Sequence, residues 1–138
     1  MAIAWRCDRE AHFVKEITPG RAISVTLTST IGQIIFVFIY GYVNDTGLTK
    51  DLLKSITTYL CQNGKPFIIG GDFNASPEQI SSRMHDLNVP CHVLPPPGTT
   101  CQSTGYAICI DYFVVHPQGQ GPVQSAMLHH ARQGCPSR

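Results

Sequence analysis

The chain has 138 residues, of which 43% are hydrophobic and 14% charged, and its formal net charge is +1. This length and composition predict a single packed domain, or part of one, and exclude a disordered chain. The near-neutral charge gives no electrostatic preference for a polyanion such as DNA. The longest apolar run, Ile34 to Tyr40, is too short to cross a bilayer, and Met1 to Arg6 lacks the pattern of a secretory signal.

Six cysteines are scattered through the chain, and no two of them form a Cys-x-x-Cys pair. This spacing favours reduced, mostly buried thiols over a zinc site or a disulfide framework. Because thiols stay reduced inside cells, the cysteine pattern predicts an intracellular protein.

The first forty residues contain three segments that we predict to be β-strands. Met1 to Trp5 is a short apolar strand, and Arg6 to Glu16 is a loop or a short edge element. After a turn at 18–20, Ala22 to Thr28 alternates apolar and polar residues, which is typical of a half-buried strand. Ile34 to Tyr40 is continuously apolar and β-prone, so we expect a central strand buried on both faces.

A strand-helix-strand unit is predicted next, with a polar turn at the carboxyl end of each strand. The first polar turn is Gly41 to Gly47, after which Thr49 is expected to cap a helix that stops at Gly64. The apolar residues of this helix fall on one face: Leu52, Leu53, Ile56, Tyr59 and Leu60. The second strand is the apolar run Phe67 to Ile69.

The second polar turn carries the strongest functional signal in the chain. The strand is expected to stop at Gly70, and Asp72 and Asn74 follow with one residue between them. In an extended turn both side chains leave the same face, so a carboxylate and a carboxamide converge on a point that can hold an ion, a water or a phosphate. The alternative is that Asp72 and Asn74 only satisfy backbone amides of a strand-to-helix turn.

A capped helix is predicted immediately after this turn, from Ser76 to about Leu87. Ser76 is a favoured N-cap residue, Pro77 suits the first helical position, and Gln79 stands where a capping box requires it. The turn is therefore fixed on both sides.

The C-terminal third is predicted to hold short strands joined by loops. Residues 89–94 suggest a short strand, residues 95–98 a rigid loop, and residues 123–128 a last strand. Tyr106 to Val115 reads as one long β-prone run with Asp111 inside it. A carboxylate in such a run is costly unless it is paired, bound to a metal or placed at a cleft.

Polar side chains thus gather beside the predicted strands, and they share oxygen-rich chemistry. They are Tyr42, Asn44, Asp45, Asp72, Asn74 and Asp111. Carboxylate, amide and phenol oxygens suit Mg²⁺, which prefers a few protein oxygens together with water and substrate phosphate. No His or Cys spacing indicates a softer metal.

Three motifs, in this order, resemble those of the endonuclease/exonuclease/phosphatase (DNase I-like) superfamily. Residues 71–74 match its Gly-Asp-(Phe/Leu)-Asn motif, and residues 110–113 match its later Ile-Asp-Tyr-(Phe/Ile) motif. Residues 39–44 are similar to its strand that ends in a tyrosine and an asparagine. The superfamily holds Mg²⁺-dependent phosphoesterases, and this chain looks like a truncated copy, with the endonuclease domain of a non-LTR retrotransposon as one candidate.

The resemblance implies an α/β protein, a partial DNase I-like β-sandwich flanked by helices, that hydrolyses phosphodiesters by in-line attack of water. Mg²⁺, or alternatively Mn²⁺, would be held by Asp72 and Asn74. Asp72 would orient or deprotonate the water, and Asn74 would place the water and the phosphate. Tyr42 would contact the phosphate, with Asn44 as a further substrate contact, and Asp111 would orient a histidine.

Three motifs of the superfamily have no counterpart in this chain. They are a strand near the amino end that carries an asparagine, the glutamate after it that is the first metal ligand, and the closing Ser-Asp-His motif, in place of which the chain has His129 and His130. The resemblance covers Ala2 to Val115, so residues 1–138 are expected to form a partial domain without the amino- and carboxyl-terminal strands.

Four functions remain open from the sequence. The chain is a nuclease acting on nucleic acid, a phosphoesterase acting on small molecules, a metal-free domain whose polar turns are only caps, or a non-catalytic remnant. A remnant would act as an interaction module and self-associate through open sheet edges.

Overall fold

The computed structural model describes residues 11–30, 32–98, 101–103 and 106–119. The strands are β1 (Ala11–Thr18), β2 (Ala22–Ser29), β3 (Gly32–Tyr40), β4 (Phe67–Asp72), β5 (His92–Leu94), β6 (Cys101–Ser103), β7 (Tyr106–Ile108) and β8 (Asp111–Val115). The helices are α1 (Thr46–Asn63) and α2 (Pro77–Asp86), and a 3₁₀ turn (Pro117–Gly119) follows β8. The strands predicted at residues 1–5 and 123–128 lie outside the described residues.

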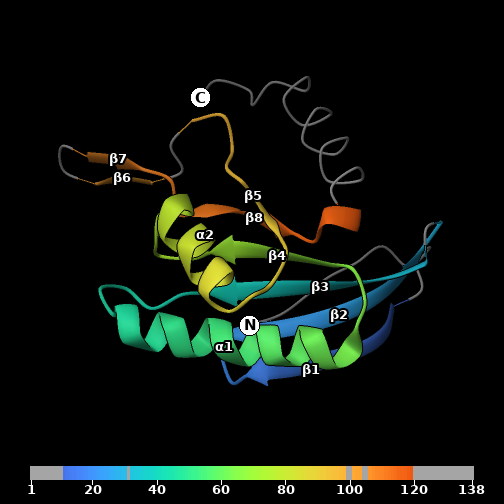
Figure 1. Cartoon of the computed structure of the whole chain (residues 1–138). Coiled ribbons are helices and arrows are strands. Elements are labelled where there is room, and N and C mark those ends of the chain that lie inside the picture. Colours follow the sequence, from blue (N-terminus) through green and yellow to red (C-terminus); the bar gives the residue numbers. More distant parts are fainter. Residues whose placement is uncertain (1–10, 31, 99–100, 104–105, 120–138) are drawn as a thin grey trace.

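The strands form one six-stranded mixed sheet in the order β1-β2-β3-β4-β8-β5 and a separate hairpin of β6 and β7. Both helices lie on the same face of the large sheet, and the hairpin projects beyond one of its ends (Figure 1). The predicted α/β class is therefore confirmed. The described residues provide one sheet of the expected sandwich, and β1 and β5 are its edges, so self-association through those edges stays a prediction.

Of the two predictions for this part of the chain, a loop or a short edge element, the structure has an edge strand, β1, which is longer than expected. All eight residues of β1 run antiparallel to β2, with register shifts near its two ends. An edge strand has a neighbour on one side only, so it can carry a mixed sequence without a clear pattern. Phe13 and Val14 on this strand are accordingly 56% and 48% exposed.

The burial of β2 and β3 also differs from the sequence expectation. Ser24, Val25 and Thr26 are all buried, so β2 is covered on both faces at its centre and not on one. Ser24 tolerates burial because its hydroxyl donates a hydrogen bond to Tyr59 Oη of α1 at 3.2 Å. In contrast, Phe38 of β3 is 39% exposed, so β3 is not buried on both faces along its whole length.

The predicted strand-helix-strand unit is confirmed as β3-α1-β4, with β3 and β4 parallel. The N-cap of α1 is Asp45 and not Thr49, because Asp45 Oδ1 accepts a hydrogen bond from Leu48 N at 2.8 Å. Thr49 is buried in the first turn, where its hydroxyl donates to Asp45 O at 2.9 Å. Gly64 ends the helix in the left-handed conformation, as predicted.

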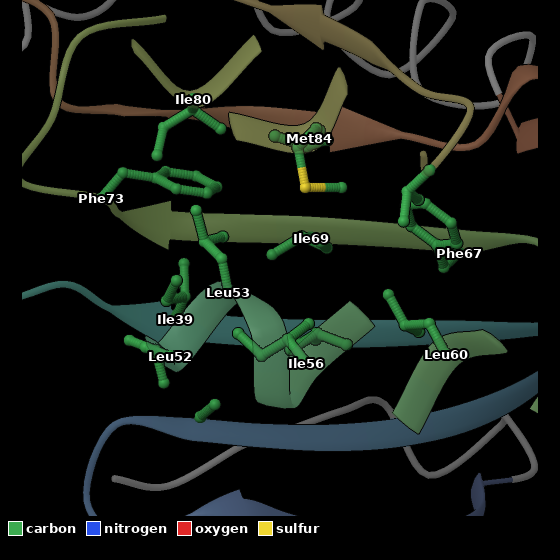
Figure 2. Close-up of a cluster of buried hydrophobic side chains, with 14 of the residues drawn as sticks. Ile39, Leu52, Leu53, Ile56, Leu60, Phe67, Ile69, Phe73, Ile80 and Met84 are labelled. Atoms are coloured by element: carbon green, nitrogen blue, oxygen red, sulfur yellow. The ribbon is translucent and has the colours of Figure 1, made fainter. Parts of the chain in front are cut away.

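The core lies between the sheet and the two helices. Figure 2 shows side chains of both helices converging on β4: Leu53 and Ile56 from α1, Ile80 and Met84 from α2, and Ile69 between them. All five side chains are fully buried. Because each helix covers its own part of β4, the polar turn that follows this strand is held against a rigid support.

The predicted run from Tyr106 to Val115 is two strands and not one. β7 pairs with β6 in the hairpin, the chain breaks at Cys109 and Ile110, and β8 then pairs antiparallel with β4. Asp111 is therefore the first residue of β8, and its side chain is exposed. The expected cost of burying a carboxylate inside a strand does not arise, because Asp111 lies at the end of the sheet.

The described part of the chain adds two findings to the sequence-based expectations. Cys61, Cys91 and Cys109 are free thiols, but Cys61 is exposed and the other two are half-buried, so the prediction of mostly buried cysteines is wrong for these three. None of the helices in the described ranges has the length and apolar character needed to span a membrane.

Candidate functional site

The site lies at the edge of the sheet where β3 and β4 end and β8 begins. Tyr40, Asp72 and Asp111 are neighbours across these three strands, since Tyr40 pairs with Asp72 and Asp72 pairs with Asp111. The parallel pairing brings the carboxyl ends of β3 and β4 together, and the antiparallel pairing adds the start of β8. Two carboxylates that are 39 residues apart in the sequence thus become neighbours in the sheet.

Asp72 is the best-defined member of the site. Its side chain is partly buried, and Asp72 Oδ1 accepts a hydrogen bond from Asn74 N at 2.9 Å. Burial raises the pKa of Asp72 above its ordinary value, and the negative charge of Asp111 raises it further. The hydrogen bond from Asn74 N acts in the opposite direction and lowers the pKa.

The turn after β4 is not the extended turn expected from the sequence. Asn74 has a φ of 48°, in the left-handed region that asparagine tolerates better than most residues. Its side-chain Nδ2 donates a hydrogen bond to Gly41 O at 3.1 Å, which ties this turn to the one after β3. Asp72 and Asn74 are brought together by the hydrogen bond between them and not by side chains leaving one face of an extended chain.

Gly41 allows the two turns to meet. A Cβ placed on Gly41 would lie 2.1 Å from Phe73 O, closer than non-bonded atoms can approach. Gly41 N donates a hydrogen bond to Asp72 O at 2.7 Å, and Gly41 O accepts the one from Asn74. This position requires glycine because of the close approach of two backbone segments.

A stacked pair of aromatic rings supports the turn from the helical side of the sheet. The rings of Phe73 and Tyr112 are 4.4 Å apart and nearly parallel, and both side chains are buried. Tyr112 Oη donates a hydrogen bond to Ala75 O at 2.8 Å. Burial raises the pKa of Tyr112 far above its ordinary value, so the phenol keeps its proton and remains a donor.

We expect Tyr112→Phe to destabilise the chain by about 1–2 kcal/mol, because it leaves the buried carbonyl of Ala75 without its partner. The stacking on Phe73 is preserved in this variant. Denaturant unfolding of the two proteins measures the difference. An unchanged free energy of unfolding would show that the hydrogen bond does not hold the turn.

Tyr42 lies in the turn after β3 and contacts a residue that the sequence reasoning missed. The guanidinium of Arg21 lies 4.2 Å from the centre of the Tyr42 ring and 5.0 Å from that of Tyr40. Arg21 Nη1 also donates to Gly41 O at 3.1 Å. Arg21 stands at the start of β2 after a turn, and no local pattern distinguishes it from an ordinary surface arginine.

Tyr42 and Asn74 also line a cleft beside this edge, with a volume of about 240 Å³. The other residues that line it are Asn44, Asp45, Thr46, Thr49, Ala75, Gln79 and Arg83. Asn44 is exposed and has a φ of 55°. Arg83 of α2 was also missed from the sequence, because a charged residue in the last turn of a helix is ordinarily a solvated one.

The oxygen atoms at the sheet edge are of the type that binds a hard cation such as Mg²⁺. Asp72 and Asp111 supply two neighbouring carboxylates, and Mg²⁺ is commonly held by one or two carboxylates together with water and substrate phosphate. The pKa of Asp72 is raised first by burial and then by the negative charge of Asp111. Within the described ranges, no group of three or more His, Cys, Asp or Glu side chains gathers to form a metal site.

The histidine that Asp111 was expected to orient is not seen in the described residues. His129 and His130 lie outside them. His116 follows Val115, at the opposite end of β8 from Asp111. Its ring packs against that of Phe67 in a T-shaped arrangement, with the ring centres 5.4 Å apart. His116 therefore does not belong to this site.

A mixed sheet with two helices on one face and a Gly-Asp-Phe-Asn turn at a strand end places the chain in the DNase I-like class of α/β folds. The model of the endonuclease/exonuclease/phosphatase family matches residues 1–134. The chain belongs to this family. No curated protein matches its sequence.

Solved structures of several different proteins have a similar fold. The endonuclease domain of TRAS1, a telomere-specific non-LTR retrotransposon, aligns with a TM-score of 0.62 and 17% identity over 83% of this chain. Cytolethal distending toxin from Actinobacillus actinomycetemcomitans aligns with a TM-score of 0.55 and 17% identity over 78% of it. Beta toxin from Staphylococcus aureus, in a mutant with bound magnesium ions, aligns with a TM-score of 0.56 and 16% identity over 74% of it.

The chain covers only part of these solved structures. It spans 58% of the TRAS1 domain, 44% of the distending toxin and 44% of beta toxin. At these identities the likeness concerns the fold alone.

Proposed function

We propose that this chain is a Mg²⁺-dependent phosphodiester hydrolase of the endonuclease type, acting on nucleic acid by in-line attack of a water. Family membership supports phosphodiester hydrolysis in general. The fold of a retrotransposon endonuclease domain supports nucleic acid as the substrate by analogy. The TRAS1 domain has a larger chain than the one described here, so the activity of the present chain alone is part of the proposal.

The observation that carries the proposal is the pairing of Asp72 with Asp111 at one sheet edge, next to Asn74. Two like charges in register, one of them partly buried, repel each other, and such carboxylate pairs are common where a site binds a cation or moves a proton. Turns that serve only as caps have no need of a second carboxylate from β8. This argument favours a functional site over a purely structural one.

Each side chain has a role in the proposed reaction. Asp72 accepts a proton from the attacking water, and its raised pKa brings it closer to the range where a general base works near neutral pH. Asn74 is fixed by Gly41 O and Asp72, so it can position the water or a phosphate oxygen without reorganising. Tyr42 contacts the phosphate from the adjoining turn, and Asp111 orients a histidine.

Asp72 and Asn74 are the residues that would hold Mg²⁺, and the carboxylate of Asp111, the neighbour of Asp72 in the sheet, adds negative charge beside them. When bound, the metal supplies charge stabilisation for the phosphoryl oxygens. A bound cation would also offset the repulsion between the charges of Asp72 and Asp111.

Asn44 lines the cleft beyond Tyr42 and is proposed to contact the substrate next to the reacting phosphate. The net charge of +1 does not discriminate between a nucleic acid and a small phosphoester. Two measurements distinguish these substrates: which of them is cleaved, and how steeply binding weakens as the salt concentration rises. Contacts to many phosphates of a nucleic acid make binding strongly salt-dependent.

The test uses two asparagines that share a backbone conformation. Asn74 and Asn88 both have positive φ, 48° and 55°, so glycine is accepted at either position without strain. We expect Asn74→Gly to lower the rate of Mg²⁺-dependent cleavage about 100-fold or more, because it removes a preorganised polar group from the site. Asn88→Gly, at the end of α2, is the matched control and should cleave as the wild type does.

Cleavage is measured on a duplex oligonucleotide and on bis(p-nitrophenyl) phosphate, with EDTA as the metal-free control. Hydrolysis of the small diester alone would contradict the nuclease assignment and favour a small-molecule phosphoesterase. Equal activity of the two glycine variants would exclude Asn74 from the site. No hydrolysis of either substrate by the wild type would favour the non-catalytic remnant.

A further inference from the structure

The cleft beside the sheet edge contains a positive group that the proposed reaction does not use. It is Arg83, which lies in α2 and lines the cleft together with Asn74, Tyr42 and Asn44. Asn74, which belongs to the proposed reacting centre, lines this cleft as well, whereas Asp72 and Asp111 do not. The cleft and the proposed centre therefore meet at Asn74.

Arg83 Nη1 is buried and has no hydrogen-bond partner among the described residues. Other polar side chains of the same cleft are satisfied within the protein. Asp45 accepts from Leu48 N, Thr49 donates to Asp45 O, and Gln79 Oε1 accepts from Ser76 N at 2.9 Å. A buried donor on a charged group is costly to leave unpaired, so Nη1 of the half-buried Arg83 stands out among the described polar atoms of the cleft.

The missing ligand should be an anion with several acceptor oxygens. Guanidinium is planar, always charged and able to donate two parallel hydrogen bonds, a geometry that matches phosphate. Among the described residues, Asp45 supplies the only carboxylate that lines the cleft, and its Oδ1 already caps α1. The surrounding oxygen and amide groups of Asn44, Asn74 and Thr46 add uncharged hydrogen-bonding capacity.

We propose that Arg83 binds a second phosphate of the substrate, the one adjacent along the strand to the phosphate at Asp72. This inference rests on the proposed function and deepens it, because it requires a substrate with at least two neighbouring phosphates. A single-stranded or duplex nucleic acid meets this requirement, whereas a simple phosphodiester does not. Arg83 is a substrate-binding residue in this scheme and takes no part in the chemical step.

The first arm of the test measures binding of inorganic phosphate, so it does not depend on activity. The Nε resonance of Arg83 is followed by NMR in the full chain without metal, and it should shift and saturate as phosphate is added. We expect Arg83→Gln to weaken phosphate binding by about tenfold, as loss of a charge-assisted hydrogen bond implies. Arg83→Lys keeps the charge but not the planar fork, so it should give an intermediate affinity.

The charge control is Lys54→Gln, which removes one positive charge from the exposed side of α1. This variant should bind phosphate as the wild type does. If Lys54→Gln and Arg83→Gln weaken binding equally, or if neither weakens it, the site at Arg83 is wrong. Should Arg83→Gln fail to fold, the comparison of Arg83→Lys with Lys54→Gln decides in the same way.

The second arm tests whether the bound phosphate belongs to a strand. Affinity is measured in EDTA for a thymidine dinucleotide without a terminal phosphate and for the same dinucleotide with a 5′ or a 3′ phosphate. The wild type should gain about tenfold in affinity from one of the terminal phosphates, and Arg83→Gln should lose that gain. No gain from either phosphate in the wild type would overturn the second-phosphate assignment, even for a chain that cleaves DNA.

The two proposals fail separately. If the dinucleotide gain depends on Arg83 but no phosphodiester is hydrolysed, the anion site stands and the proposed reaction fails. If hydrolysis depends on Asn74 but Arg83→Gln binds all probes as the wild type does, the reaction stands and the anion site fails. Rates on bis(p-nitrophenyl) phosphate, which has one phosphate, should be the same for wild type and Arg83→Gln.

Discussion

Gly41→Ala is expected to destabilise the chain by about 3 kcal/mol or more, because the new methyl group meets backbone and not a movable side chain. The Cβ would lie 2.1 Å from Phe73 O and 2.5 Å from Phe73 C. Gly41 cannot move away easily, since its N–H bonds Asp72 O and its carbonyl accepts from Asn74 Nδ2. Either the hydrogen bonds that join the two turns break, or the clash remains.

The matched control for this prediction is Gly47→Ala. Gly47 lies in the first turn of α1, and a Cβ there would have Asp45 Oδ1 as its nearest neighbour at 3.5 Å, an ordinary contact. Alanine favours a helix over glycine, so this variant should gain up to about 1 kcal/mol. Denaturant unfolding measures both changes. Two glycine substitutions with the same small effect would mean that the turns do not approach as closely as described.

The best-predicted part of the fold is the segment in which the signals are local. Ser76 accepts from Gln79 N, and Gln79 Oε1 accepts from Ser76 N, so the capping box read from the sequence is present in the structure. Gly64 likewise ends α1 with a φ of 59°, where glycine has no side-chain penalty. Residues three or four positions apart determine such features, and a single sequence contains them in full.

The features that the sequence did not predict are those that depend on strand pairing. The β-prone run from Tyr106 to Val115 contains no signal for the break at Cys109. Before this break the chain pairs with β6, and after it the chain pairs with β4. In the same way, the mixed sequence of β1 left a loop and a short edge element both open, and pairing with β2 decides for a strand.

The tertiary fold also determines which residues surround the site. The motifs predicted that Asp72 and Asp111 would be near each other, and the sheet register makes them direct neighbours. No motif indicated Arg21 or Arg83, because their relation to the site depends on ring contacts and a cleft formed by distant segments. A resemblance supplies the residues that a family shares, and a structure adds those that belong to the individual chain.

Asp72→Asn is expected to lower the rate of phosphodiester cleavage about 1,000-fold or more, since an amide cannot accept a proton from water at neutral pH. The substitution keeps the size of the side chain and an oxygen that can accept from Asn74 N, so the turn should retain its conformation. The cleavage assay with the duplex oligonucleotide measures the rate. A variant that cleaves as fast as the wild type would remove Asp72 from the reaction.

The same variant should be more stable than the wild type at pH 7 when no metal is present. The pKa of Asp72 in the folded chain lies above its unfolded value of 3.8, so the folded state holds this proton more tightly than the unfolded state does. Ionisation of Asp72 therefore costs stability, and the cost is absent below pH 3.8 and develops as the pH rises through the raised pKa. Thermal melts in EDTA should show a higher Tm for Asp72→Asn at pH 7, with the difference disappearing in acid.

Adding Mg²⁺ should reverse this order, because a cation that binds only the folded state compensates the charge that destabilises it. At about 100 times its dissociation constant, such a ligand adds about 2.7 kcal/mol to the free energy of unfolding. We expect this gain in the wild type and not in Asp72→Asn, which has lost one of the two paired carboxylates. The pair of melts thus separates a metal site from a structural turn: a turn that needs Asp72 only as a cap would lose stability in the variant and would not respond to Mg²⁺ in either protein.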